Sequence, residues 1–158
     1  MSGTFSNESV EMALAFLINT LLVATVVVIH HEALNGLFRI GQKLTVHRNL
    51  ALLIGVFGAL IAHIIEIWLF AIGYFYMVHS ESFETLQGNF DGTLIDCAYF
   101  SFTTYTSLGF GDIEPLGHLR FTAGLEALTG LVMITWTASF MFLKMQRYWI
   151  HRQDGTGH

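Results

Sequence analysis

Long apolar segments alternate with short polar ones along this chain, and the apolar segments predict its architecture. Three of them are long enough to cross a bilayer: Val10–Ile29, Leu50–Val78 and Phe121–Leu143. A transmembrane helix needs about 20 apolar residues, so each segment predicts one spanning helix. A half-apolar stretch, Thr93–Thr104, lies between the second and third segments. As a helix it would be about 18 Å long, which suits a re-entrant helix that does not span.

Composition places the chain in the all-α membrane class. Of its 158 residues, 53% are hydrophobic and only 12% are charged, and the mean hydropathy is +0.56. Soluble domains carry about 25% charged residues. The net charge of −5 gives no basic surface for nucleic acid, and the single cysteine, Cys97, excludes a disulfide framework within the chain.

The positions of the basic residues predict an orientation. Six of the seven Lys and Arg residues lie between the first two spans or after the third, at Arg39, Lys43, Arg48, Lys144, Arg147 and Arg152. Loops rich in Lys and Arg stay on the cytoplasmic side. We therefore expect a cytoplasmic C-terminus, an N-terminus outside, and Asp112 on the outer side. Arg120, at the outer end of the third span, is the exception.

A run of hydroxyl residues followed by Gly-Phe-Gly-Asp, at residues 103–112, separates the short helix from the third span. Backbone at membrane depth must be paired internally or line a watery cavity. Gly109 and Gly111 can take positive φ without a Cβ penalty, which allows successive carbonyls to turn toward one axis. The segment predicts a carbonyl-lined cation filter.

The stretch from Tyr99 to Pro115, YFSFTTYTSLGFGDIEP, resembles the pore loop of potassium channels, whose filter commonly reads TVGYG. The order of span, short helix, filter and span over about Leu50–Arg147 is also similar to that family, in particular to small bacterial two-helix-pore channels. The first span is an addition. The resemblance implies a homotetramer in a bacterial inner membrane that conducts K⁺ passively, with lipids as its other partners. It implies no enzymatic activity, no small-molecule substrate and no cofactor besides K⁺ in the filter.

The same resemblance divides the chain into parts. We expect a peripheral helix and cytoplasmic loop at 1–48, a pore domain at 49–147 and a short tail at 148–158. Within the pore domain we expect an outer helix at 49–78, a turret at 79–92, a pore helix at 93–104, a filter at 106–112 and an inner helix at 118–147.

The resemblance also assigns roles in the filter. Its ion-coordinating residues are Thr106, Ser107, Leu108, Gly109, Phe110 and Gly111, with K⁺ held at Ser107, Leu108, Gly109 and Phe110. Asp112 forms the outer mouth.

Three residues depart from the common filter, because Ser107 replaces Thr, Leu108 replaces Val or Ile, and Phe110 replaces Tyr and lacks its hydroxyl. These changes predict a filter that is held less rigidly. A weakly selective Na⁺/K⁺ channel and a non-conducting homologue are therefore the alternatives within this class.

The third span is expected to be the inner helix. Gly130 lies where many relatives have a hinge glycine, and close helix packing is the alternative role for it. Four residues at helical spacing are predicted to line the cavity below the filter: Leu131, Ile134, Ala138 and Phe142. Phe142 is the candidate hydrophobic gate. The alternative is that this face contacts lipid or other helices.

Three ionisable residues lie within the spans, namely His63, Glu66 and Glu126. Such residues are expensive in hydrocarbon and mark functional sites by default. His63 and Glu66 share a helix face at i, i+3 spacing. One hypothesis is a proton-sensitive network that braces the filter from behind, since His titrates near physiological pH. The other is a static set of hydrogen bonds between the spans.

Histidines and a glutamate also gather at the inner end of the first span, at His30, His31 and Glu32, with His47 before the second span. This cluster suggests a metal site. A hypothesis from a different class follows, a membrane metalloprotein with ligands among His30, His31, Glu32, His63, Glu66 and Glu126. That hypothesis leaves residues 107–112 unexplained.

Overall fold

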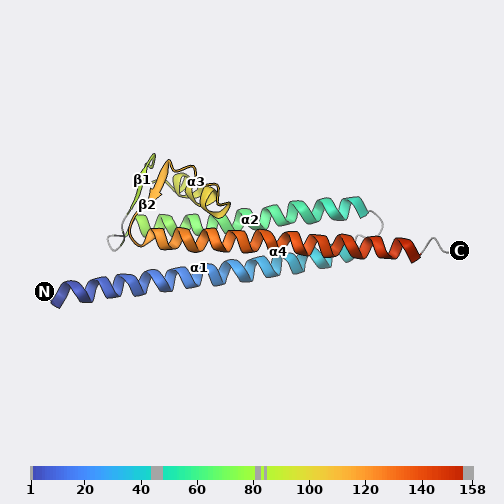
Figure 1. Ribbon diagram of the computed structural model, residues 1–158, viewed down its shortest axis with the longest axis horizontal. Coiled ribbons are helices and arrows are strands. Elements are labelled where there is room, and N and C mark those ends of the chain that lie inside the picture. The colour runs from blue at the N-terminus through green and yellow to red at the C-terminus, as the bar shows by residue number, and fades with distance from the viewer. Residues whose placement is uncertain (1, 44–47, 81–82, 84, 155–158) are drawn as a thin grey trace.

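Three long helices lie side by side along the molecule, and a short helix and a two-stranded ladder lie near one end (Figure 1). The computed structural model describes residues 2–43, 48–80, 83 and 85–154. Its elements are α1 (Ser2–Lys43), α2 (Arg48–Val78), β1 (Leu86–Gly88), α3 (Leu94–Tyr105), β2 (Ile113–Pro115) and α4 (Leu119–Asp154). Three helices are long and apolar enough to cross a membrane, over Met12–Gln42, Leu50–Val78 and Leu119–Gln146. The prediction of three spans with a short helix between the second and third is confirmed.

Two helices extend further than hydropathy predicted. Helix α1 continues from Ile29 to Lys43, so His30 lies inside a helix and not at its end. Helix α4 continues to Asp154, past the expected end at residue 147. Polar residues such as Gln and Lys are good helix formers, so a fall in hydropathy does not mark a helix end. His47 lies outside the described residues.

A short antiparallel ladder is the one regular element that an all-α prediction missed. Leu86 lies opposite Pro115, and Gly88 lies opposite Ile113. The Asn89 amide also donates a 2.9 Å hydrogen bond to the Asp112 carbonyl. Three-residue strands are too short to show an alternating pattern, so the sequence gives no signal for them. The ladder joins the chain before α3 to the chain that follows residues 106–112.

Helix α1 packs closely on α2 because two glycines of α2 accommodate leucines of α1. A Cβ on Gly58 would overlap the Leu37 side chain, and a Cβ on Gly73 would overlap Leu22. Small residues let membrane helices approach closely and gain van der Waals contact. The two contacts at Gly58 and Gly73 hold α1 against about half the length of α2.

A capping box starts α3. The Thr93 hydroxyl accepts a 3.1 Å hydrogen bond from the Asp96 amide, and the Asp96 carboxylate accepts from the amides of Thr93 and Asp91. The interaction with the Thr93 side chain is the main cause that lowers the pKa of Asp96, and the two backbone amides lower it further. A capping box satisfies amides that a helix start leaves unpaired. The helix therefore begins at Leu94, and its other end is set by the polar segment after Tyr105.

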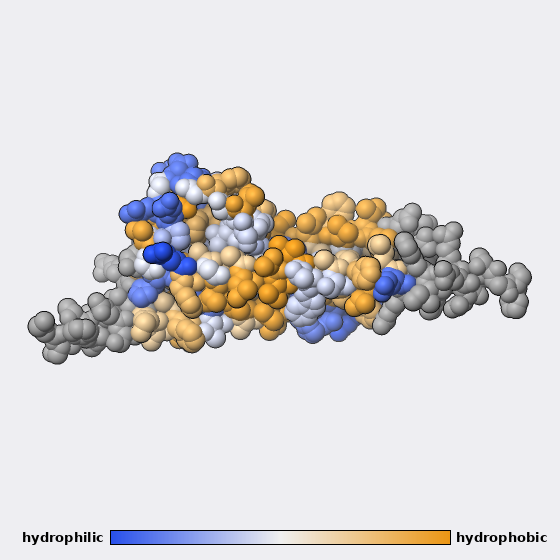
Figure 2. Space-filling view, in the orientation of Figure 1, coloured by the Kyte–Doolittle hydropathy of each residue, from blue (hydrophilic) through white to orange (hydrophobic). Residues whose placement is uncertain are grey.

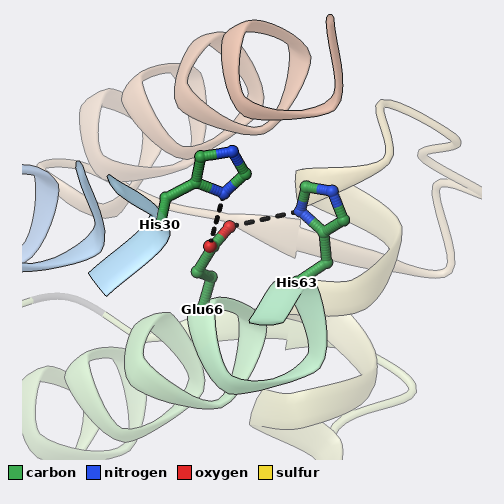
Figure 3. Close-up of side chains that lie close together, drawn as sticks. All are labelled: His30, His63 and Glu66. Carbon is green, nitrogen blue, oxygen red and sulfur yellow. Dashed lines mark hydrogen bonds and ion pairs between the residues drawn. The ribbon is translucent and has the colours of Figure 1, made fainter. Parts of the chain in front are cut away.

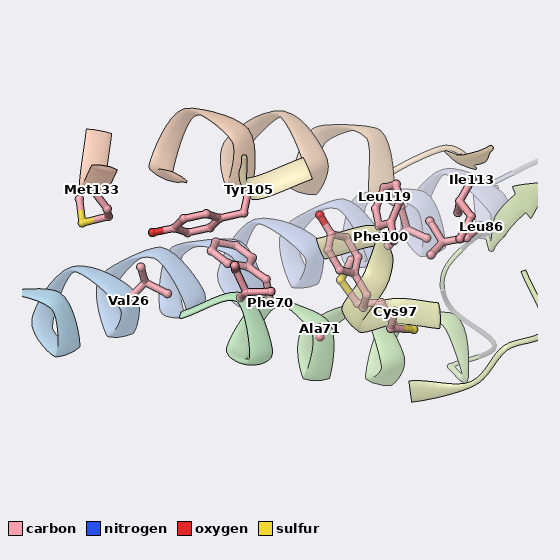
Figure 4. Packing of buried hydrophobic residues seen from close by; sticks show 13 residues of the cluster. Val26, Phe70, Ala71, Leu86, Cys97, Phe100, Tyr105, Ile113, Leu119 and Met133 are labelled. Atoms are coloured by element: carbon pink, nitrogen blue, oxygen red, sulfur yellow. The ribbon is translucent and has the colours of Figure 1, made fainter. Parts of the chain in front are cut away.

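The apolar core lies where α3 packs against α2 and α4, and Val26 of α1 belongs to the same cluster (Figure 4). Tyr74 and Phe100 meet edge-on, with ring centroids 5.0 Å apart, and Phe70 and Val26 are buried beside them. Apolar side chains also cover much of the outer surface of the long helices, whereas hydrophilic ones gather over the end that carries the ladder (Figure 2). Such a surface suits helices in contact with lipid.

Candidate functional site

Backbone φ changes sign at every residue from Thr106 to Gly111. Thr106 has a φ of −82°, and the positive values are +57° at Ser107, +47° at Gly109 and +75° at Gly111. In an extended strand, carbonyls alternate between the two sides. Left-handed residues at every second position instead rotate the peptide planes so that successive carbonyls turn toward one side.

Hydrogen bonds leave the carbonyls of this segment free. The amides of Leu108 and Gly109 both donate to the Thr103 carbonyl, at 2.8 and 3.1 Å, and the Ser107 amide donates to Thr104. Among the described residues, no hydrogen bond reaches the carbonyls of residues 106–111. The last turn of α3 therefore satisfies the amides of residues 106–109, while a row of carbonyl oxygens remains available to a cation.

Ser107 holds a strained conformation. It is the only non-glycine residue with a positive φ in the described part of the chain. A left-handed conformation costs a non-glycine residue about 1–2 kcal/mol. Such strain persists where the surrounding structure imposes it, and it gathers at functional sites.

Asp112, the residue after this segment, is held from both sides. The Tyr99 hydroxyl of α3 donates a 2.8 Å hydrogen bond to the Asp112 carboxylate, and Asn89 binds its backbone carbonyl. The bond to Asp112 is the main cause that raises the pKa of Tyr99. Phe110 has no hydroxyl with which to tie the segment to α3, so the tie here runs from α3 to Asp112.

Behind the segment, five buried or partly buried side chains from all four helices form one polar network. Figure 3 shows its centre, formed by His30, His63 and Glu66. His30 Nδ1 of α1 lies 2.8 Å from Glu66 Oε1 of α2, and His63 Nδ1 lies 3.3 Å from Oε2. The Tyr105 hydroxyl of α3 donates to Glu66 Oε2. Thr137 Oγ1 of α4 lies 3.3 Å from His30 Nε2 and 3.2 Å from His63 Nε2. The network links the end of α3, next to Thr106, to each long helix.

A second network surrounds Glu126 of α4. The Tyr74 hydroxyl donates a 2.6 Å hydrogen bond to Glu126 Oε2, and Ser101 contacts Oε1. Ser101 Oγ also lies 2.8 Å from the Ile67 carbonyl. All three polar side chains are fully buried. This network ties the middle of α3 to α2 and α4.

Residues 50–147 match the ion channel family. The chain belongs to this family. The match begins in α2 and ends in α4, so it contains the 106–112 segment and both carboxylates of the two networks. Comparisons with curated proteins and with solved structures gave no match. Because the family is one of ion channels, the prediction that the chain is not an enzyme is confirmed.

In this member of the ion channel family, the predicted grouping of ionisable residues is only partly present. His63 and Glu66 are in contact, as their spacing suggested, but Glu126 belongs to the second network. His30 joins His63 and Glu66, and the ligand atoms of these three lie within 4.8 Å of one another. His31 is exposed and contacts Asn35.

The sequence grouped His30 with His63 and Glu66 only as candidate metal ligands, and it gave no role in a network to Tyr105, Thr137, Tyr74 or Ser101. His30 is separated from its partner by 36 residues and Thr137 by 74 from His63, so only helix packing reveals the contacts. No pattern in the sequence distinguishes Tyr105 and Ser101 from the other residues of the short helix. A polar residue within an apolar span was the one available signal, and it applied to His30.

The four predicted lining residues of α4 are all exposed, whereas Gly130 is buried. Gly130 faces the end of α3, where a Cβ would overlap the Tyr105 carbonyl. Ile134 and Ala138 line a cavity of about 530 Å³ between α2, α3 and α4. Leu131 and Phe142 are more than half exposed in the described chain, and they do not line this cavity.

Proposed function

We propose that this chain is a subunit of a potassium-selective channel, with residues 106–111 as its filter. The single observation that carries the proposal is the alternation of φ along a segment whose carbonyls accept no hydrogen bond among the described residues. Rings of backbone carbonyls replace the hydration shell of K⁺ in filters of this kind. One chain offers one row of carbonyls, so four chains around an axis complete each ring.

The position of α3 supports the same proposal. Its C-terminal end, at Tyr105, precedes the filter directly. The C-terminus of a helix carries a partial negative charge, which favours a cation nearby. Asp112 follows the filter, and in four copies its carboxylate would form an acidic ring that concentrates cations at the mouth.

We propose that Asp112 faces the outside of the cell and that the C-terminus is cytoplasmic, in a bacterial inner membrane. Six of the seven Lys and Arg residues lie toward the ends of the helices farthest from the filter, where the positive-inside rule places the cytoplasm (Figure 1). On the same axis, Leu131, Ile134, Ala138 and Phe142 of α4 are the proposed lining of the conduction path, with Phe142 as its gate.

A weakly selective cation channel is the second candidate. The observation that favours it is the 64% exposure of the Phe110 side chain, which has no hydroxyl to bind α3. The Tyr99–Asp112 hydrogen bond favours the first candidate, because it holds the outer end of the filter. Reversal potentials in mixed K⁺ and Na⁺ separate the two. A potential that follows the K⁺ gradient supports selectivity, and one that follows both gradients supports the second candidate.

Gly109→Ala, with Gly92→Ala as its control, tests the filter itself. Both glycines have positive φ, at +47° and +78°, and a Cβ has open space at both. The backbone strain is therefore alike, about 1–2 kcal/mol, but only Gly109 lies in the proposed filter. In proteoliposomes loaded with K⁺, we expect Gly109→Ala to lower K⁺ flux about tenfold or more and Gly92→Ala to conduct like the unmodified protein.

Equal flux from Gly109→Ala and Gly92→Ala would contradict the assignment of the filter. An unmodified protein that is folded but passes neither K⁺ nor Na⁺ would instead identify a non-conducting homologue.

A further inference from the structure

Four side chains from three helices form a closed ring behind the filter. Figure 3 shows three of them, His30, His63 and Glu66. Glu66 contacts Nδ1 of both His30 and His63, and Thr137 contacts Nε2 of both. The side chains of Glu66 and His30 are 0% and 1% exposed, and that of His63 is 14% exposed. All four imidazole nitrogens therefore have a polar neighbour, so the hydrogen-bond donors and acceptors can be counted.

The ring needs one more hydrogen than its side chains hold when both imidazoles are neutral. The Tyr105 hydroxyl donates to Glu66 and also lies 3.0 Å from His63 Nδ1. Five hydrogen bonds each need one hydrogen. Two run from the histidine Nδ1 atoms to the Glu66–Tyr105 pair, and one runs from the Tyr105 hydroxyl to Glu66. The other two join the Thr137 hydroxyl to the two histidine Nε2 atoms. Two neutral imidazoles and two hydroxyls hold four, and an ionised carboxylate holds none. A fifth hydrogen makes one imidazole an imidazolium beside Glu66.

We propose that this ring binds one proton and that the bound proton ties α4 to α1 and α2. With the proton present, Thr137 accepts from one imidazole and donates to the other. When the proton leaves, the buried Glu66 carboxylate keeps its three donors, because an ionised group without donors is costly in the interior. One of the two contacts at Thr137 then lacks a hydrogen. The tie between α4 and one histidine is lost as the pH rises.

The short spacing between His30 and Glu66 favours a proton over a metal ion at this pair. Zinc binds nitrogen and oxygen ligands at about 2.0–2.2 Å, so ligands in a tetrahedral site lie about 3.3 Å apart. His30 Nδ1 and Glu66 Oε1 are 2.8 Å apart, which is the distance of a charge-assisted hydrogen bond.

The other titratable groups around the ring have partners of their own and do not supply this proton. On α1, His31 points to Asn35 and the Trp136 ring. On α3, Tyr105 is already a donor to Glu66. On α4, Glu126 is engaged with Tyr74 and Ser101. Lys144, seven residues beyond Thr137, lies over the Phe38 ring at 4.2 Å. Glu66 is thus the carboxylate that balances the proton.

A consequence for conduction rests on the proposed function. Thr137 adjoins Ala138, and both line the cavity of about 530 Å³ that also borders His63 and Thr106. A tie at Thr137 therefore acts on the helix that we propose as the lining of the conduction path. Loss of the proton removes one of the two ties of α4 at this level, so K⁺ flux changes with pH.

Proton uptake is measured directly by ¹⁵N NMR of histidine-labelled protein in lipid, with His30→Gln and His63→Gln used for assignment. We expect His30 and His63 together to take up one proton with a single midpoint. Thr137→Val removes the hydroxyl at nearly constant shape, and we expect this variant to lose the shared uptake of one proton. Thr137→Ser keeps the hydroxyl and should keep the shared uptake. Two separate one-proton titrations, no titration, or a stoichiometric metal in the purified protein would overturn the proposal.

The coupling to α4 is tested by K⁺ flux over the same pH range. We expect the unmodified protein to change its flux at the NMR midpoint, and Thr137→Val to lose that change. Thr135→Val is the matched control, since the Thr135 hydroxyl bonds only to Leu131 of its own helix, and it should keep the change. A flux response that survives in Thr137→Val would overturn the coupling. If no variant conducts at any pH, the proposed function fails, while NMR still decides whether the ring binds its proton.

Discussion

At the residue scale, the two buried carboxylates differ in what surrounds them. Glu66 faces two imidazoles, whereas Glu126 has no Lys, Arg or His within ion-pair distance among the described residues. Around Glu126, three close oxygen contacts join Tyr74, Ser101 and the Ile67 carbonyl. The two hydroxyls supply only two hydrogens, so the third must come from Glu126 itself. The contacts therefore require a protonated Glu126.

A protonated Glu126 predicts that Glu126→Gln is tolerated and Glu126→Ala is not. The glutamine amide donates to Ser101 and its carbonyl accepts from Tyr74, so we expect a change within about 0.5 kcal/mol. Alanine leaves the buried Tyr74 hydroxyl without a partner and should lower the free energy of unfolding by about 1–3 kcal/mol. Denaturant unfolding in detergent measures both. Glu32→Gln, at an exposed position, is the control, and a Gln variant as unstable as the Ala variant would mean that Glu126 is ionised.

At the element scale, the contact between α4 and α3 depends on the absence of a side chain at Gly130. The Tyr105 carbonyl, at the end of α3, occupies the space of a Cβ at this position. The sequence left two roles open for Gly130, a hinge and a packing contact. The geometry supplies a reason for the packing role, and the hinge stays a prediction.

Gly130→Ala is expected to destabilise the protein, with Gly124→Ala as the matched variant on the same helix. An added Cβ at 130 meets backbone and must displace one helix, which costs about 1–3 kcal/mol. At Gly124 a Cβ has open space, and alanine should be neutral or stabilising by up to about 1 kcal/mol. Unfolding in detergent and K⁺ flux are measured together. A Gly130→Ala variant of unchanged stability but altered flux would favour the hinge.

Prediction from the sequence worked for elements whose signal is local. Hydropathy located the three spans, and a short half-apolar stretch located α3 to within a residue at each end. The β1–β2 ladder was missed because strands of three residues are too short to show an alternating pattern. The ends of α1 and α4 were misplaced because a helix can continue in polar sequence. The two networks depend on helix packing, so only the His63–Glu66 pair, at i, i+3, was predictable.

At the scale of the whole molecule, a single chain leaves its proposed filter incomplete. Leu108 and Phe110 are 60% and 64% exposed, and Phe102 of α3 is 51% exposed. One row of carbonyls can contact an ion from one side only, while replacing a hydration shell needs oxygens all around it. Copies arranged around an axis supply both the missing oxygens and partners for these apolar side chains.

A shared pore predicts how mixtures of unmodified protein and Gly109→Ala behave when the two are co-expressed at known ratios. If each chain conducts alone, K⁺ flux falls in proportion to the unmodified fraction. If four chains share one filter and one altered chain disables it, flux falls as the fourth power of that fraction. At equal amounts the first case leaves half of the flux and the second about one sixteenth. We expect the steeper curve, with Gly92→Ala mixtures showing no loss. A linear fall would contradict the tetramer while leaving the assignment of the filter intact.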